Sequence, residues 1–127
     1  MSRSEARRPR AADDGRRQPP GPERARPEHL LYADRVLRIA RTVTPDSSVM
    51  RLVGEIDATN SRAMLTTLTR ARHTDERLVL DLRDVTFADV SAVKALTVFT
   101  ADGTIHVRDT PPQLARLMRL LHLPPFG

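Results

Sequence analysis

The chain has no cysteine, only four aromatic residues, and no apolar run long enough to cross a membrane. The lack of cysteine excludes disulfides, thiolate metal sites and a cysteine nucleophile, and it favours an intracellular protein. A membrane-spanning helix needs about 20 consecutive apolar residues, and the N-terminus lacks the apolar centre of a secretory signal. We therefore predict a cytoplasmic protein with no membrane partner.

Glycine is also scarce, with five residues and no phosphate-binding loop, which gives nucleotide binding no support. The four histidines show no metal-ligand spacing, and none neighbours a serine nucleophile in a recognisable motif. Four carboxylates could be considered as magnesium ligands: Asp57, Asp81, Asp84 and Asp89. The acid pair and the lysine of such sites are missing. We predict a protein that is not an enzyme, with no catalytic residues, metal or cofactor.

Positive charge is concentrated near the N-terminus. Residues 1–28 contain eight arginines, five acids and five of the ten prolines, which leaves about +2 of the net charge of +5 for the remainder. Such a segment buries too little apolar surface to offset the entropy of ordering it. We predict a disordered Arg/Pro-rich tail over residues 1–29 and one folded domain over residues 30–127. Because the chain offers no aromatic stacking platform, we do not expect nucleic acid as a partner.

The apolar periodicity of the remainder predicts alternating strands and helices. The expected order is a strand over residues 35–43, a strand over 49–56, a helix over 60–72, a strand over 77–82, a loop over 83–89, a helix over 91–99, a strand over 104–107 and a helix after Thr110. The first strand is expected at a sheet edge, and the strand over 77–82 at the centre, covered on both faces. Val93 and Leu96 are expected to face inward. This order predicts an α/β domain, with helices packed against a mixed sheet of about four strands.

Several ordered sequence motifs resemble one known family. Gly54-Glu55-Ile56-Asp57 precedes the first helix, Leu78-Val79-Leu80-Asp81-Leu82 is followed by Val85-Thr86-Phe87-Ala88-Asp89, and a proline-led helix ends in an apolar-Pro-Pro-Phe segment. Over residues 33–127 these motifs resemble the STAS domain family of anti-sigma factor antagonists. The resemblance implies a STAS-like fold. It also implies a protein-binding module that regulates transcription by partner switching with an anti-sigma factor of the serine-kinase type.

The chain departs from this family at the switch segment. Family members typically carry Asp-Ser-Ser/Thr-Gly at the start of the second helix, where the first serine is phosphorylated, whereas this chain has Asp89-Val90-Ser91-Ala92. Val90 therefore occupies the usual phosphoacceptor position, and Ser91 is the remaining candidate or simply a first-turn helix residue. The departure leaves open a non-phosphorylatable STAS scaffold or a ligand-sensing subunit of a regulatory complex. A further alternative is nucleic-acid binding by the tail.

The resemblance places the partner-binding surface on the loop before the first helix and on the start of the second. The predicted contact residues are Asp57, Thr59, Asn60, Ser61, Asp89, Val90, Ser91, Val93 and Lys94. Asp57 and Asp89 each also precede a helix, where a short acid caps free backbone N–H groups and complements the helix dipole. The two roles can coexist. The expected partner is an anti-sigma factor or a related regulatory protein.

Overall fold

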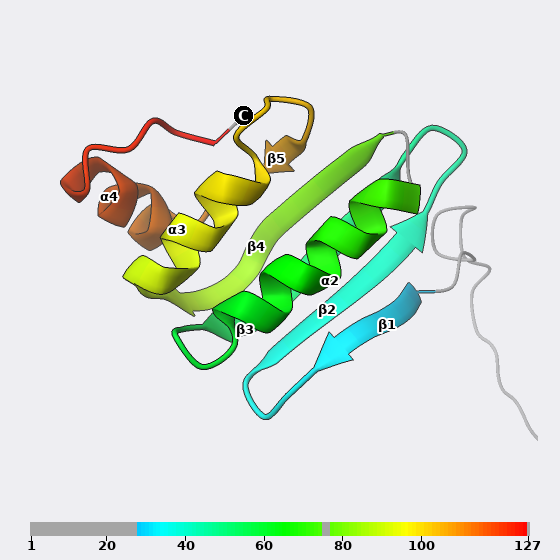
Figure 1. The fold of residues 1–127 in the computed structure, drawn as a ribbon, viewed down its shortest axis with the longest axis horizontal. Helices are drawn as coiled ribbons and strands as arrows, with labels where there is room; N and C mark the ends of the chain where they lie inside the picture. The colour runs from blue at the N-terminus through cyan, green and yellow to red at the C-terminus, as the bar shows by residue number, and fades with distance from the viewer. Residues whose placement is uncertain (1–27, 75–76, 127) are drawn as a thin grey trace, which may run out of the picture.

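The computed structural model describes residues 28–74 and 77–126 and places five strands and three helices in them (Figure 1). The elements are β1 (Glu28–Ala33), β2 (Leu37–Val43), β3 (Ser48–Ile56), α2 (Ser61–Thr74), β4 (Leu78–Ala88), α3 (Val90–Phe99), β5 (His106–Arg108) and α4 (Pro112–Leu120). The predicted mixed α/β fold is confirmed. Most of the predicted tail lies outside the described residues.

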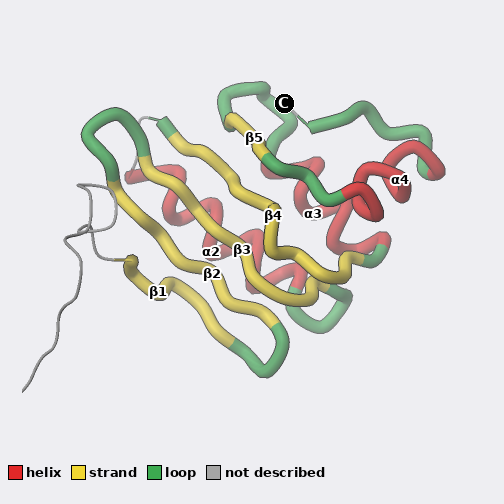
Figure 2. Tube along the Cα trace, turned by 180° about the vertical axis from the view of Figure 1, so that it is seen from behind, coloured by secondary structure: helices red, strands yellow, loops and turns green. Residues whose placement is uncertain are grey.

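The strands follow one another across a single sheet in the order β1-β2-β3-β4-β5. The pairs β1–β2 and β2–β3 are antiparallel, as short turns allow, whereas β3–β4 and β4–β5 are parallel and need a crossover. The helices α2 and α3 provide these crossovers and lie on one face of the sheet (Figure 1). Seen from behind, the strands lie in front of α2 and α3 (Figure 2).

The core lies between the sheet and the helices. Along β3 the side chains alternate, so that Met50 and Leu52 are fully buried while Arg51 is partly exposed, as the two-residue period of a strand requires. The other elements contribute Leu37, Ile39, Met64, Leu68, Leu80, Leu82, Val93, Leu96, Leu114 and Met118. Among the described residues, no helix combines the length and the apolar character that crossing a membrane requires.

The first strand was not predicted from the sequence. Residues 28–33 form β1, which makes β2 an interior strand and corrects its expected place at the sheet edge. Five of the six β1 residues are exposed, so no alternating apolar pattern marks this strand. It is held instead by pairing with β2 and by the Arg51 guanidinium, whose Nη2 lies 2.9 Å from Glu28 Oε2.

The predicted loop over residues 83–89 is also corrected, because β4 continues to Ala88. The register passes from Arg51 opposite Asp81 to Val53 opposite Asp84, and again from Gly54 opposite Val85 to Glu55 opposite Phe87, so β4 carries an extra residue at each of two β-bulges. Asp81 Oδ1 accepts a hydrogen bond from Arg83 N at 3.0 Å within the first bulge. A bulge breaks the two-residue alternation, which made the second half of the strand resemble a loop. The strand is also covered by helices on one face, not on both as predicted.

The C-terminal end of α4 turns the chain back along the helix. Leu123 N donates to Met118 O at 2.9 Å and His122 N donates to Arg119 O at 3.1 Å, with His122 at a positive φ of 57°. These two bonds form a Schellman motif, a common helix terminator. Residues 123–126 therefore run back past α4 as a non-helical segment, which we call the C-terminal segment (Figure 1).

Candidate functional site

The two segments predicted to bind a partner meet at one edge of the sheet. Because β3 and β4 are parallel neighbours, the loops that follow them lie at the same edge. The backbone confirms this: Asp89 N, at the end of β4, donates to Ile56 O, at the end of β3, at 3.2 Å. Residues distant in the sequence thus form one continuous surface.

The Asp89 carboxylate joins these two segments. Its Oδ1 accepts from Ala92 N at 3.0 Å, which caps α3, so the predicted capping role is confirmed. Its Oδ2 accepts from Ala58 N at 3.2 Å in the β3–α2 loop. One side chain therefore fixes both the start of α3 and the position of the neighbouring loop.

Asp57 organises its own loop rather than the first turn of α2. Its Oδ1 accepts hydrogen bonds from the backbone N and the hydroxyl of Thr59, both of which precede the helix. These bonds favour the charged form, the hydroxyl bond most strongly, and lower the pKa of Asp57 below its usual 3.8. The predicted capping role of Asp57 is thus replaced by a role within the loop, and the carboxylate stays ionised at neutral pH.

Two of the predicted contact residues lie beneath the surface. Asn60 is 1% exposed, and its side chain accepts from Asp57 N at 2.9 Å and donates to Glu55 O at 3.0 Å. Val93 is fully buried in the core on α3. Neither side chain is exposed enough to contact a partner directly.

The remaining predicted residues are reachable to different degrees. Val90 is 41% exposed at the first position of α3, Lys94 is exposed on the same helix, and Thr59 is exposed on the loop. Ser61 and Ser91 are partly buried. Phe87, which is 48% exposed at the end of β4, was not among the predicted contact residues. The available signal was a large apolar side chain within a segment predicted to be a loop, since loops run over the surface.

We call this region the loop–helix surface and define it by its accessible members: Asp57, Ala58, Thr59, Phe87, Val90, Ser91 and Lys94. Its apolar side chains, Phe87 and Val90, flank Asp89 in the chain, where β4 passes into α3. Exposed apolar side chains of this size, rimmed by polar groups, are typical of surfaces that bind other proteins.

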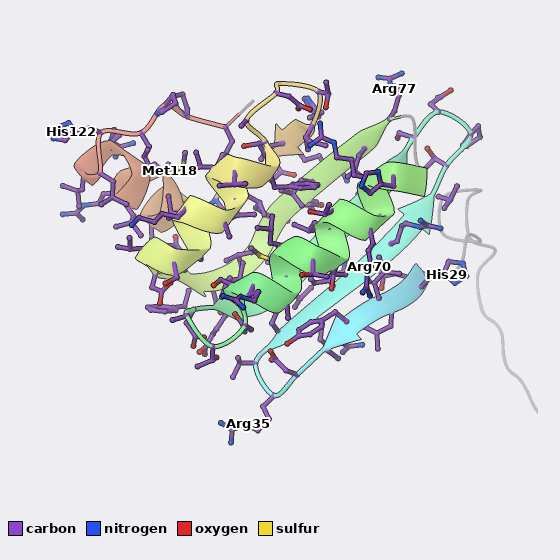
Figure 3. The ribbon with its side chains drawn as sticks, viewed as in Figure 1. His29, Arg35, Arg70, Arg77, Met118 and His122 are labelled. Carbon is purple, nitrogen blue, oxygen red and sulfur yellow. The ribbon has the colours of Figure 1, made fainter. Side chains whose placement is uncertain are left out.

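An acidic hollow adjoins the loop–helix surface. It has a volume of about 510 Å³ and is lined by Tyr32, Asp34, Arg35, Val36, Glu55, Asp57 and Thr59. Arg35 lies at the tip of the β1–β2 turn and points away from the fold (Figure 3). Within the described parts of the chain, His, Asp and Glu side chains form no group of three that could hold a metal ion. Asp81 and Asp84 lie on β4 instead, where each contacts an arginine.

Asp34 is the most strongly perturbed carboxylate in this hollow. Tyr32 Oη donates to its Oδ2 at 2.7 Å, and the backbone N–H groups of Val36 and Leu37 donate to its Oδ1 at 2.8 Å. These hydrogen bonds, the Tyr32 bond foremost, lower the pKa of Asp34 from 3.8 to about 2. The carboxylate thereby fixes the β1–β2 turn that forms one wall of the hollow.

The Asp34 carboxylate should contribute stability that disappears in acid. Because its pKa is lower in the folded protein than in the unfolded chain, its contribution is complete above about pH 4 and is lost as the pH falls toward about 2. We expect urea unfolding curves of wild type and Asp34→Asn to differ at pH 7 and to converge near pH 2. Asp46→Asn, an exposed residue of the β2–β3 turn, is the control. An unchanged difference between wild type and Asp34→Asn across this range would contradict the assignment.

Comparison with known proteins finds a matching domain family and solved structures with a similar fold. The family model described as "Mlab, STAS domain" matches residues 39–124. The fold is similar to the crystal structure of an anti-sigma factor antagonist from Mycobacterium paratuberculosis, which is 22% identical, with a TM-score of 0.58 over 72% of this chain and 83% of that one. It is also similar to the anti-sigma factor antagonist SpoIIAA in its unphosphorylated form, which is 18% identical, with a TM-score of 0.52 over 71% of this chain and 84% of that one. No curated protein matches the chain by sequence.

Proposed function

The chain belongs to the STAS domain family, and on that premise we propose that it is an anti-sigma factor antagonist that regulates transcription by binding an anti-sigma factor of the serine-kinase type. The observation that carries the proposal is the Asp89 carboxylate, which holds the β3–α2 loop and the start of α3 together as one exposed surface. We further propose that the protein acts in the cytoplasm, as a binding module rather than an enzyme.

The composition of the loop–helix surface supports protein binding. Phe87 and Val90 offer exposed apolar area, and Lys94 follows Val90 by one helical turn, so its charge lies on the same side of α3. Asp57 adds an ionised carboxylate at the rim. A central apolar contact surrounded by charges that set orientation is the usual anatomy of a specific protein interface.

Regulation at this surface must differ from the family's usual phosphoswitch. Val90 has no hydroxyl group to accept a phosphoryl group, so we propose Ser91, the next residue, as the phosphoacceptor candidate. A phosphoryl group would add roughly −1.5 to −2 charge beside Asp89 and would repel a partner that binds the unmodified surface.

A second candidate function is a non-phosphorylatable scaffold or ligand-sensing subunit of a regulatory complex. Val90 at the switch position favours it, as does Ala92, which is fully buried and fills the place of the family's glycine. Nucleic-acid binding by residues 1–29 is the remaining alternative. It would be lost at moderate salt and on deleting those residues, whereas binding through the loop–helix surface should survive both.

A charge placed at Val90 should separate these functions. We expect full-length wild-type bait to retain a serine-kinase-type anti-sigma factor from host lysate with ADP or ATP present, and Val90→Glu to weaken binding of the purified factor by at least about tenfold, because an unpaired charge would be desolvated in the interface. The matched control is Val98→Glu, since Val98 is 65% exposed in the last turn of the same helix.

The outcomes are distinguishable in the same experiment. Retention of an anti-sigma factor by wild type and Val98→Glu but not by Val90→Glu supports partner switching through the loop–helix surface. Retention of other regulatory subunits, with no anti-sigma factor under either nucleotide, would support the scaffold instead. Equal weakening by both glutamate variants would show that the contact lies elsewhere.

A further inference from the structure

A mainly apolar pocket of about 310 Å³ lies between α4 and the C-terminal segment. From α4 it is lined by Ala115, Met118 and Arg119, and from the C-terminal segment by Leu123, Pro125 and Phe126. Figure 3 marks Met118 on α4 and His122 in the turn between the two walls. Among the residues that line this pocket, none belongs to the loop–helix surface, and the proposed function does not use it.

The local sequence explains why this pocket forms. The Schellman motif at His122 reverses the chain, so that the C-terminal segment passes beside the helix it has just left. Pro124 and Pro125 have fixed φ angles and no N–H group, so the C-terminal segment cannot form a helix that packs against α4. Met118, which is 2% exposed, belongs to both the core and the pocket lining. One wall of the pocket is therefore part of the packed core.

The pocket lining contains one charged side chain, that of Arg119, and no acidic residue. No carboxylate of the described residues lies within ion-pair distance of Arg119. The other arginine of α4, Arg116, lies outside the lining. The Thr110 hydroxyl is a further polar group in the lining. A ligand that fits must therefore combine an apolar body with a negatively charged group.

We propose that this pocket binds a small aliphatic monocarboxylate, with the alkyl chain between α4 and the C-terminal segment and the carboxylate on Arg119. The volume lies at the lower end of the roughly 300–1,000 Å³ range of small-molecule sites, and the apolar lining with few polar groups is typical of them. A guanidinium suits a carboxylate because its N–H groups can form paired, charge-assisted hydrogen bonds. A medium-length alkyl chain, such as that of octanoate, is small enough for a site at this end of the range.

Titration of the full-length protein with octanoate, followed by amide NMR, tests the proposal. We expect saturable binding with a Kd below about 1 mM, and the largest shifts at Thr110, Leu123 and Phe126. Arg119→Gln should weaken octanoate binding by about tenfold or more, because a charge-assisted bond is lost. Arg116→Gln is the matched control, since it removes the same charge from the same helix outside the pocket lining, and it should leave the Kd unchanged. Octanol, which has the same chain length without a charge, should bind wild type and Arg119→Gln equally.

A pocket-filling variant tests the site independently of charge. Ala115→Leu places extra side chain in the lining and should abolish saturable octanoate binding, with a thermal melt to confirm that the variant is folded. If it does not fold, the comparison of Arg119→Gln with Arg116→Gln decides alone. The proposal is overturned by absence of saturation, by shifts centred on the loop–helix surface, or by equal weakening in the two glutamine variants, which indicates unspecific attraction to positive charge.

Discussion

Replacing Gly54 by alanine should cost the protein a large part of its stability, about 3 to 5 kcal/mol. Gly54 has a φ of 115°, a backbone conformation that residues with a Cβ rarely adopt. A Cβ at this position would also collide with the carbonyl oxygen of Val36, which is fixed because it accepts a hydrogen bond from Glu55 N at 2.8 Å. Relieving the collision means breaking this bond and displacing the turn before β2, so strain and a lost hydrogen bond add together.

Thermal and urea unfolding of Gly54→Ala measure this loss, and Gly103→Ala is its control. Gly103 also has a positive φ, 77°, but a Cβ there meets no atom within 4 Å. We expect Gly103→Ala to lose only about 1 kcal/mol from backbone strain, and Gly54→Ala to melt at least about 10 °C lower than that control. Equal losses in the two variants would show that the Val36 carbonyl moves aside freely, which contradicts the explanation.

Asn60→Asp should be the second most damaging of these substitutions, with a loss of about 3 kcal/mol in the free energy of unfolding. The buried amide of Asn60 donates to Glu55 O, and a carboxylate in its place would set one acceptor against another. Asn60 also helps to lower the pKa of Asp34, so a second negative charge would lie near an existing one.

Thr59→Ala provides the comparison for Asn60→Asp, because Thr59 is the exposed neighbour and loses only a loop hydrogen bond to Asp57. We expect less than about 1 kcal/mol for that variant in urea unfolding. If Asn60→Asp were as mild as Thr59→Ala, the amide would be exposed in solution, as the predicted place of Asn60 among the partner contacts requires.

Two predictions from the sequence disagreed about the burial of Val93. Helical periodicity placed Val93 on the inward side of its helix, and the structure buries it completely. The family resemblance placed the same residue in the partner surface, which its burial excludes. The periodicity was the better guide here, because the face that a helix buries follows from the spacing of its apolar residues.

The amino-acid sequence by itself determined the elements whose signal is local. The spacing of apolar residues predicted the three helices and the middle strands, and the motifs around Gly54 and Asp89 indicated the family. These features depend on backbone preferences and on side-chain periods within one segment, which neighbouring residues in the chain are enough to set.

The tertiary structure decided the features that depend on contacts between distant segments. It showed β1, which pairing with β2 and Arg51 holds in place without an apolar pattern of its own, and the two bulges through which β4 continues to Ala88. It also separated buried Asn60 from exposed Phe87. The physical reason is that burial depends on what packs over a residue from other elements, and only the folded chain brings those elements together.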